Sequence, residues 1–109
     1  HTLLQLPDPP TAIIACNDVV AISALNTVHE MGLRVPEDIS LIGFNNIPES
    51  ANTFPPLTTI DSPTEILGQY AAELLLKVMS SEGLEDTEQI IDTKLIVRGS
   101  TGPCRSDNQ

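Results

Sequence analysis

The order of apolar and polar positions divides the first half of the chain into three elements. Two short apolar runs, 11–16 (TAIIAC) and 39–44 (ISLIGF), are bounded by proline, asparagine or acidic residues, a pattern typical of strands buried on both faces. Between the two runs, apolar residues recur at helical spacing from Asn17, a good N-cap residue, to Gly32, a natural helix stop. Two strands joined by a helix predict a right-handed βαβ unit with parallel strands.

The second half predicts a third strand at 57–60 (LTTI) and two short strands at 90–91 and 94–98. It also predicts a helix over 62–80, because the motif SPTE begins at Ser62 and supplies a capping box. The apolar arc of this helix spans about 220°, which is wider than one contact face requires. We therefore expect the helix to expose apolar side chains at Ile66, Tyr70 and Leu74.

Composition and charge narrow the class of protein. The 109 residues include 15 acidic and 5 basic side chains and have a net charge of −10, which argues against binding of nucleic acid by this chain alone. No apolar run approaches the roughly 20 residues of a membrane helix, and residues 1–10 do not resemble a signal peptide. Two cysteines are too few for a disulfide scaffold. We expect a cytoplasmic α/β protein with no membrane partner.

The residues that carry enzyme chemistry are not arranged for it. The serines lack a nucleophile-elbow motif, and the six glycines form no phosphate loop. Cys16 lies in an apolar run, which favours an inert buried thiol. The two cysteines and two histidines have no metal-ligand spacing. We therefore expect no catalytic residues, no cofactor and no metal.

Polar residues follow the predicted parallel strands, where open sheets bind ligands. Asn17 follows the first strand, Asn45 and Asn46 follow the second, and Asp18 and Asp61 lie at equivalent positions. Amides and carboxylates suit a neutral polyhydroxy ligand such as a sugar. The simpler alternative, which spacing alone favours, is that Asn17 only caps a helix and the asparagine pair only forms a turn.

Four stretches in sequence order carry a resemblance to a known family. They are PPTAIIACNDVVAISALNTVHEMGLRVPEDISLIGFNNIP, PPLTTIDSP, LGQYAAELLLKVM and KLIVRGSTGP. Together they cover about residues 6–103 and resemble the C-terminal part of the effector domain of LacI/GalR-family transcriptional regulators. The resemblance implies a partial type I periplasmic-binding-protein-like fold, built from parallel-sheet βαβ units. It also implies a homodimer that binds DNA only through a headpiece absent from this chain.

The resemblance also implies a division of the chain into four parts. Residues 1–61 would form a βαβ segment of the C-terminal lobe, with the effector rim. Residues 62–80 would form a crossover helix that belongs to the other lobe. Terminal strands would occupy 81–103, and 104–109 would be a disordered tail.

Individual positions carry over as well. Asn17 matches a family asparagine that often contacts the effector, and Asn45 matches an aspartate that commonly binds effector hydroxyls. The pair Asn45-Asn46 departs from the usual aspartate pair, which puts the usual sugar contact in doubt and could favour a different ligand. Four further residues match the family's dimer-facing surface, with ordinary core packing as the alternative: Ile22, Leu25, Thr53 and Phe54.

The leading hypothesis is the effector-sensing and dimerising portion of a transcriptional repressor, in which a sugar-like ligand allosterically controls operator binding. The alternative is a sugar-binding component of a transport or chemotaxis system. An enzyme, such as a small hydrolase, ranks third because the chain lacks a nucleophile, a metal set and a phosphate loop.

Overall fold

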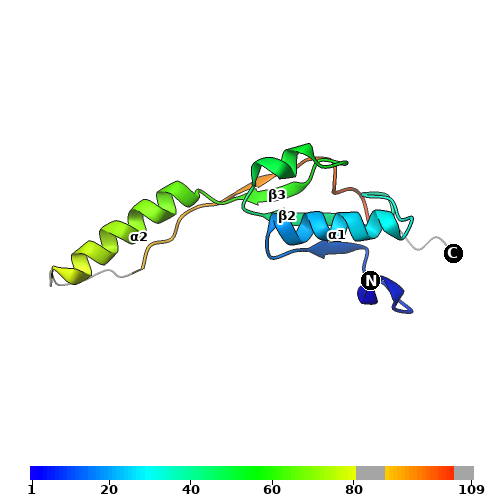
Figure 1. Cartoon of the computed structure of the whole chain (residues 1–109), viewed down its shortest axis with the longest axis horizontal. Coiled ribbons are helices and arrows are strands. Elements are labelled where there is room, and N and C mark those ends of the chain that lie inside the picture. The colour runs from blue at the N-terminus through cyan, green and yellow to red at the C-terminus, as the bar shows by residue number, and fades with distance from the viewer. Residues whose placement is uncertain (81–87, 105–109) are drawn as a thin grey trace.

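The computed structural model describes residues 1–80 and 88–104. The chain forms a four-stranded sheet with one helix packed on it and a second helix that extends away (Figure 1). In chain order the elements are η1 (Thr2–Gln5), β1 (Ala12–Ile14), α1 (Asp18–Glu30), β2 (Ser40–Phe44), η2 (Pro48–Asn52), β3 (Thr58–Asp61), α2 (Thr64–Met79) and β4 (Lys94–Ile96), where η1 and η2 are short 3-10 helices.

The sheet has the order β1-β2-β3-β4, with β1, β2 and β3 parallel and β4 antiparallel to β3. The register pairs Ile13 with Leu41 and Gly43 with Thr59. The predicted βαβ unit and the α/β class are thus confirmed, and the third strand lies one residue later than expected. Because β1, β2 and β3 are parallel, their carboxyl ends meet at one edge of the sheet.

Helix α1 covers one face of the sheet, where it buries Ala21, Leu25 and Val28. These side chains share a core with Leu41 of β2 and Leu57, just before β3. Burying the apolar surface of such side chains is the main stabilising term of the unit. The remaining core residues come from β1 and from the segment that leads into β2: Ala15, Val35 and Ile39.

The strands are not buried on both faces, which corrects the expectation from their apolar runs. Buried and half-buried residues alternate along β2, and Ile14 of β1 is 75% exposed. The reason is that α1 covers only one face of the sheet in the part of the chain that the structure describes. Cys16 is also exposed, so the prediction of a buried thiol is wrong.

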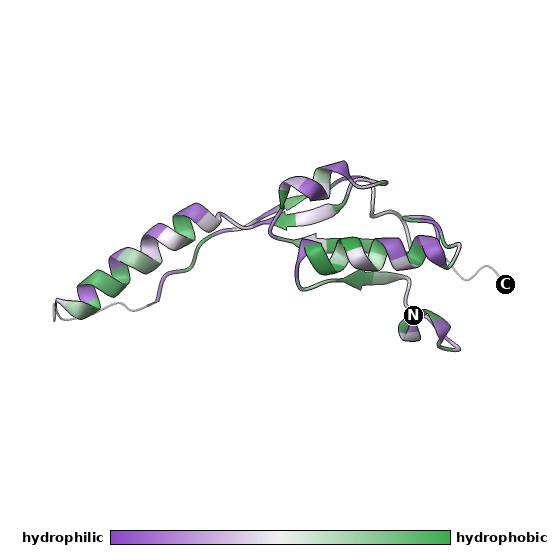
Figure 2. Ribbon diagram, in the orientation of Figure 1, coloured by the Kyte–Doolittle hydropathy of each residue, from purple (hydrophilic) through white to green (hydrophobic). Residues whose placement is uncertain are grey.

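Helix α2 extends away from the sheet, and the chain returns beside it to β4 (Figure 1). The molecule measures 63 × 28 × 22 Å and has a radius of gyration of 18.7 Å, against about 13 Å for a compact chain of this length. None of the residues Thr64–Met79 is buried, although many are apolar (Figure 2). As predicted, Ile66 and Tyr70 are exposed, while Leu74 is half-buried.

The start of α2 differs from the prediction. The N-cap position is occupied by Pro63, and no side-chain cap is formed there. The Ser62 carbonyl instead accepts a hydrogen bond from the amide of Thr64 at 2.8 Å. The helix therefore begins at Thr64, one residue later than a cap at Ser62 would require. Within the described chain, no helix is long and apolar enough to cross a membrane.

The C-terminal segment is less regular than predicted. Residues 90–91 form no strand, and the strand expected over 94–98 is limited to β4. Beyond it, Ser100 is fully buried and links β2 to β3: its hydroxyl donates to the Leu41 carbonyl at 2.6 Å and accepts from the Thr58 amide at 2.8 Å. The predicted terminal strands and tail also include 81–87 and 105–109, which lie outside the described residues.

Candidate functional site

The predicted ligand-binding asparagines follow adjacent parallel strands. Asn17 comes after β1 and Asn45 comes after β2, so both lie at the edge of the sheet where the parallel strands end. The Asn45 amide donates to the Ile60 carbonyl at 2.8 Å, which extends the pairing of β2 with β3 to the rim. The structure therefore brings Asn17, Asn45 and the end of β3, Asp61, to one edge.

Asn17 is the N-cap of α1. Its side-chain oxygen accepts a hydrogen bond from the Val20 amide at 2.9 Å, which satisfies one of the free N–H groups of the first helical turn. The capping alternative is therefore correct for this oxygen. Within residues 1–80 and 88–104 the Asn17 Nδ2 makes no hydrogen bond, so the amide still offers a donor to a ligand.

Asn45 and Asn46 form a turn with left-handed backbone, with φ of 101° and 52°. Asparagine adopts this region more readily than most residues, and the conformation places consecutive side chains at the rim. The Asn45 side chain is exposed and makes no hydrogen bond within the described residues. Asn45 is thus the member of the pair whose amide can both donate to and accept from a ligand.

The Asn46 side chain is already occupied by the protein. Its oxygen accepts from Arg98 Nη2 at 2.7 Å, and its Nδ2 donates to Asp61 Oδ1 at 3.1 Å. A carboxylate in place of this amide would face the Asp61 carboxylate and lose the donor. These bonds order the rim, and contact of Asn46 and Asp61 with a ligand stays a prediction.

Asp18 is fully buried, which corrects its placement at the ligand rim. One carboxylate oxygen accepts from the Thr59 hydroxyl at 2.5 Å, and the other accepts from the Ile47 amide at 2.8 Å. A Cβ at Gly43 would collide with this carboxylate, so the glycine makes room for it. Asp18 therefore holds the turn at 45–47 against β3 and is a structural residue.

The four residues predicted to face a dimer partner fall into two groups. Leu25 is buried in the core, so the packing alternative holds for it, and its dimer-facing assignment is wrong for that reason. Ile22 is half-buried against the same core. Thr53 is half-buried and Phe54 is 86% exposed, which leaves the segment after η2 accessible.

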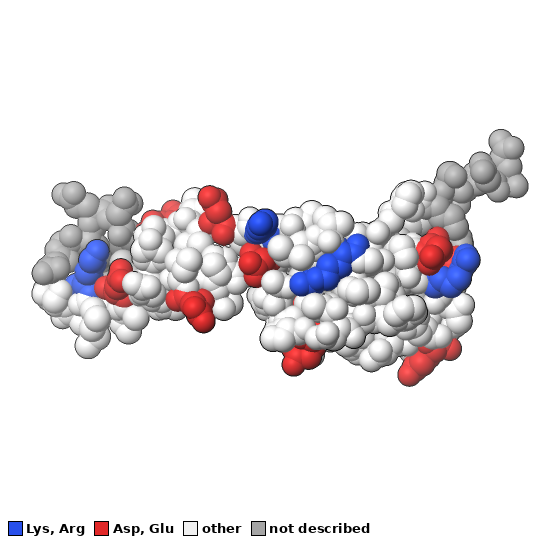
Figure 3. Space-filling model, turned by 90° about the horizontal axis from the view of Figure 1, so that it is seen from above, with Lys and Arg blue, Asp and Glu red and all other residues white. Residues whose placement is uncertain are grey.

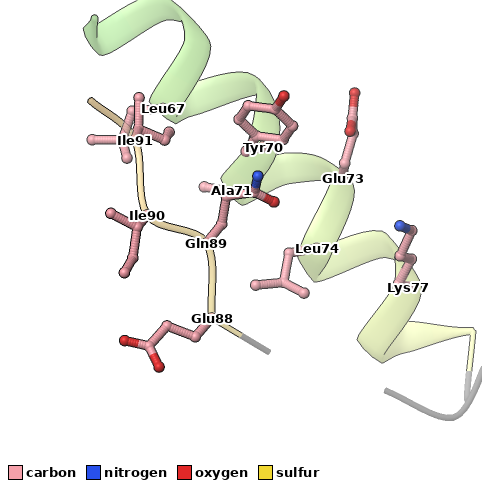
Figure 4. A pocket seen from close by; sticks show the side chains of 10 residues that line it. All are labelled: Leu67, Tyr70, Ala71, Glu73, Leu74, Lys77, Glu88, Gln89, Ile90 and Ile91. Atoms are coloured by element: carbon pink, nitrogen blue, oxygen red, sulfur yellow. The ribbon is translucent and has the colours of Figure 1, made fainter. Parts of the chain in front are cut away.

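Two grooves of the described chain lie away from these asparagines. One of about 650 Å³ is formed by α2 and residues 88–91 (Figure 4). The other, about 660 Å³, lies between η1, Ile13 and the outer side of α1. Neither groove includes Asn17 or Asn45. The described residues contain no group of histidine, cysteine or acidic side chains that could hold a metal.

Basic side chains are few and dispersed. On the face shown in Figure 3 the Lys and Arg residues are separated from one another and lie near acidic residues. Such a surface offers no clustered contacts for phosphates.

Sequence reasoning missed Arg98, Ser50 and Thr59 at this site. Arg98 donates to the Asn46 side chain, to the Ser50 hydroxyl and to the Leu57 carbonyl. The signal that could have found Arg98 is the motif RGSTG, which lies within the last of the four stretches that resemble the family.

A comparison with known families identifies the domain. The model of the periplasmic binding protein-like domain matches residues 1–101. The chain belongs to this family. Among curated proteins it is 46% identical over 99 residues to the HTH-type transcriptional repressor CytR of Escherichia coli K12, covering 91% of this chain and 29% of that protein. It is 49% identical over 75 residues to the repressor PurR of Aliivibrio salmonicida, covering 69% and 22% of the two chains.

Solved structures agree with this assignment. A putative LacI regulator from Bacillus cereus subsp. cytotoxis matches with a TM-score of 0.86 and 37% identity, over 92% of this chain and 36% of that one. A LacI-family regulator from Enterococcus faecalis with bound ribose matches with a TM-score of 0.80 and 37% identity, over 94% and 38%. The lac repressor dimer on its operator matches at 0.75 and 35%, over 84% and 32%.

These relatives confirm the resemblance to LacI/GalR regulators and their periplasmic-binding-protein-like effector domain. The chain spans less than a third of the length of the curated relatives it matches here.

Proposed function

We propose that this chain is the effector-sensing and dimerising C-terminal portion of a cytoplasmic LacI/GalR-type transcriptional repressor. A small polar ligand, a sugar or a molecule that contains one, binds at the rim that carries Asn17 and Asn45. The observation that carries the proposal is a pair of side-chain amide donors, on Asn17 and Asn45, that have no partner among the described residues. They follow adjacent parallel strands, at the edge where such folds bind ligands.

The mechanism is linkage between two binding equilibria. Ligand and operator prefer different arrangements of the two lobes, so each changes the affinity of the other by the same factor. In this proposal residues 1–61 supply the ligand rim, and α2 lies in the other lobe, where its exposed apolar side chains are covered. The segment containing Thr53 and Phe54 faces the partner subunit.

The rim groups that are left free for a ligand are amides. Asn17 offers a donor, and Asn45 offers a donor and an acceptor, while the nearby carboxylates are bonded to other groups of the chain. This set favours an uncharged, hydroxyl-rich ligand over a cationic one. D-ribose, which the Enterococcus relative holds, is therefore the first probe.

The test uses the full-length protein that carries this chain, with D-ribose binding measured by calorimetry and operator binding measured without ligand. Asn45→Ala should weaken ribose binding roughly fivefold to tenfold, because one or two neutral hydrogen bonds are lost. Asn17→Asp keeps the capping oxygen but removes the Nδ2 donor, and it should weaken binding by a similar factor. Operator affinity should stay unchanged.

Asn26→Ala is the matched control, since Asn26 is an exposed asparagine of α1. It should leave ribose affinity and operator affinity as they are. If wild type binds neither ribose nor other sugars, or if the rim variants lose operator binding without ligand, the proposal is wrong.

A further inference from the structure

Arg98 joins two parts of the chain to which the proposed function gives different roles. We propose that Arg98 is a positioning residue that couples the ligand-facing turn, residues 45–47, to the dimer-facing segment, residues 50–54. The inference rests on the proposed function for the roles of the two segments, but the connection itself is a property of the described structure.

The guanidinium reaches both segments at once. Nη2 donates to the Asn46 side-chain oxygen at 2.7 Å, and Nη1 lies 3.0 Å from the Ser50 hydroxyl and 2.8 Å from the Leu57 carbonyl. The backbone of Arg98 is held in turn, because its amide donates to the Thr58 hydroxyl at 3.0 Å. The backbone of Arg98 is therefore anchored on the sheet, while the two terminal nitrogens of its guanidinium bind the turn 45–47 and the segment 50–54.

Ser50 continues the connection into the dimer-facing segment. It is fully buried, its hydroxyl donates to the Ile47 carbonyl at 2.6 Å, and its carbonyl accepts from the Leu57 amide at 2.8 Å. The hydroxyl of Thr53 lies 3.2 Å from that same carbonyl. A displacement of the turn therefore changes hydrogen bonds on both sides of Ser50.

The chemistry of arginine suits this task. A planar guanidinium presents donors in a fixed fork, so two acceptors on different segments are held at a set distance, whereas a lysine ammonium is a single point on a flexible stem. On the other side of the turn, Asp18 binds the Ile47 amide. A ligand that pulls on Asn45 must therefore act on Asn46, its neighbour in the chain and a partner of Arg98.

The first test needs no ligand and uses hydrogen–deuterium exchange, residue by residue, in the full-length protein. In Arg98→Met the amides of Asn46, Ser50 and Leu57 should exchange roughly tenfold faster or more. The reason is that local opening of these segments then no longer has to break the charge-assisted hydrogen bonds of the guanidinium. The amide of Leu41, in β2, should keep its protection.

Arg34→Met is the matched control. Arg34 pairs with Asp38 at 2.8 Å on the surface, where the hydrogen bond and charge of Asp38 raise the pKa of the guanidinium. Its removal should leave exchange in both segments unchanged. If Arg98→Met fails to fold, Arg98→Lys replaces it, and it should keep the protection of one segment and lose that of the other.

A double-mutant cycle separates a connection from two independent contacts. Asn46→Ala alone should speed exchange at Ser50 and Leu57, and it should add little further in the Arg98→Met background. Additive effects would overturn the proposal, as would unchanged exchange in either segment after loss of the guanidinium.

The second test measures dimer dissociation by sedimentation, with and without D-ribose. In wild type the ligand should change the dissociation constant, and in Arg98→Met this change should shrink toward none. A variant that is merely less stable would keep the ratio. Absence of ribose binding in wild type would count against the proposed function and leave the exchange test standing, so the two failures are distinguishable.

Discussion

Helices α1 and α2 are both amphipathic, yet only one of them has a buried face. Ala21, Leu25 and Val28 of α1 are almost inaccessible to water, whereas no residue of α2 is buried. The difference lies in what each helix meets: α1 lies on the sheet, and α2 extends beyond it. An apolar face therefore shows which side chains a helix can bury. Whether they are buried depends on whether another element packs against that face.

The polar groups show the same contrast. Around the sheet, Asp18, Ser50 and Ser100 are fully buried, and each forms at least one hydrogen bond with a segment distant in the chain. Along α2 the side-chain hydrogen bonds are local, such as that from Gln69 to Glu73 at 3.1 Å. The sheet unit is therefore cross-linked in three dimensions, while α2 is held mainly by its own backbone.

The largest expected difference comes from shortening a leucine in each region. Leu25→Ala should lower the free energy of unfolding by about 2–5 kcal/mol, since it leaves a cavity in the core. Leu74→Ala, on α2, should cost less than about 1 kcal/mol because Leu74 is only half-buried in the groove beside residues 88–91. Urea denaturation of the two variants would measure both values, and equal losses would refute the contrast between the regions.

A smaller effect is expected from adding one methyl group in the sheet. Gly43→Ala places a Cβ against the Asp18 carboxylate, which cannot retreat because Thr59 and Ile47 hold it. Overpacking of this kind should cost about 1–3 kcal/mol. The shift should appear as a lower midpoint in urea with an unchanged slope, and a stability equal to that of wild type would show that the carboxylate moves freely.

The same substitution should have the opposite sign, and the smallest size, in α2. Gly68 lies in the middle of the helix, and a Cβ there meets no atom within 4 Å. Gly68→Ala should therefore stabilise the helix by about 0.5–1 kcal/mol, because alanine loses less backbone entropy. Far-UV circular dichroism on warming would detect the later loss of helix, and a loss of helical signal would contradict the prediction.

The sequence predicted which helices and strands form better than it predicted where they begin and end. The parallel βαβ unit, the cap at Asn17 and the third strand follow from local patterns, and all are present. The strand at 90–91 and the cap at Ser62 are not. Residues 90–91 have no pairing partner among the residues that the structure describes, and a cap at Ser62 competes with the hydrogen bond from the Thr64 amide to the Ser62 carbonyl. Patterns along a chain do not contain these competing contacts.

The candidate site was predicted in position but not in detail. Strand order places Asn17 and Asn45 at one edge, and any parallel pair would do so. Burial distinguishes the other residues. Asp18 is buried by hydrogen-bonding partners that lie 29 and 41 residues away in the chain, and Leu25 is buried in the core that α1 shares with the sheet. The part played by Arg98 depends on contacts across 41 to 52 residues, so the motif RGSTG can mark the residue but does not reveal its partners.

The Asn46 amide stands between a cation and an anion, donating toward Asp61 and accepting from Arg98. Positions 46 and 61 are therefore a single choice for anyone who redesigns ligand preference here. An aspartate at 46 would keep an acceptor for Arg98 but lose the donor to Asp61, so a library that varies the two asparagines should vary position 61 with them.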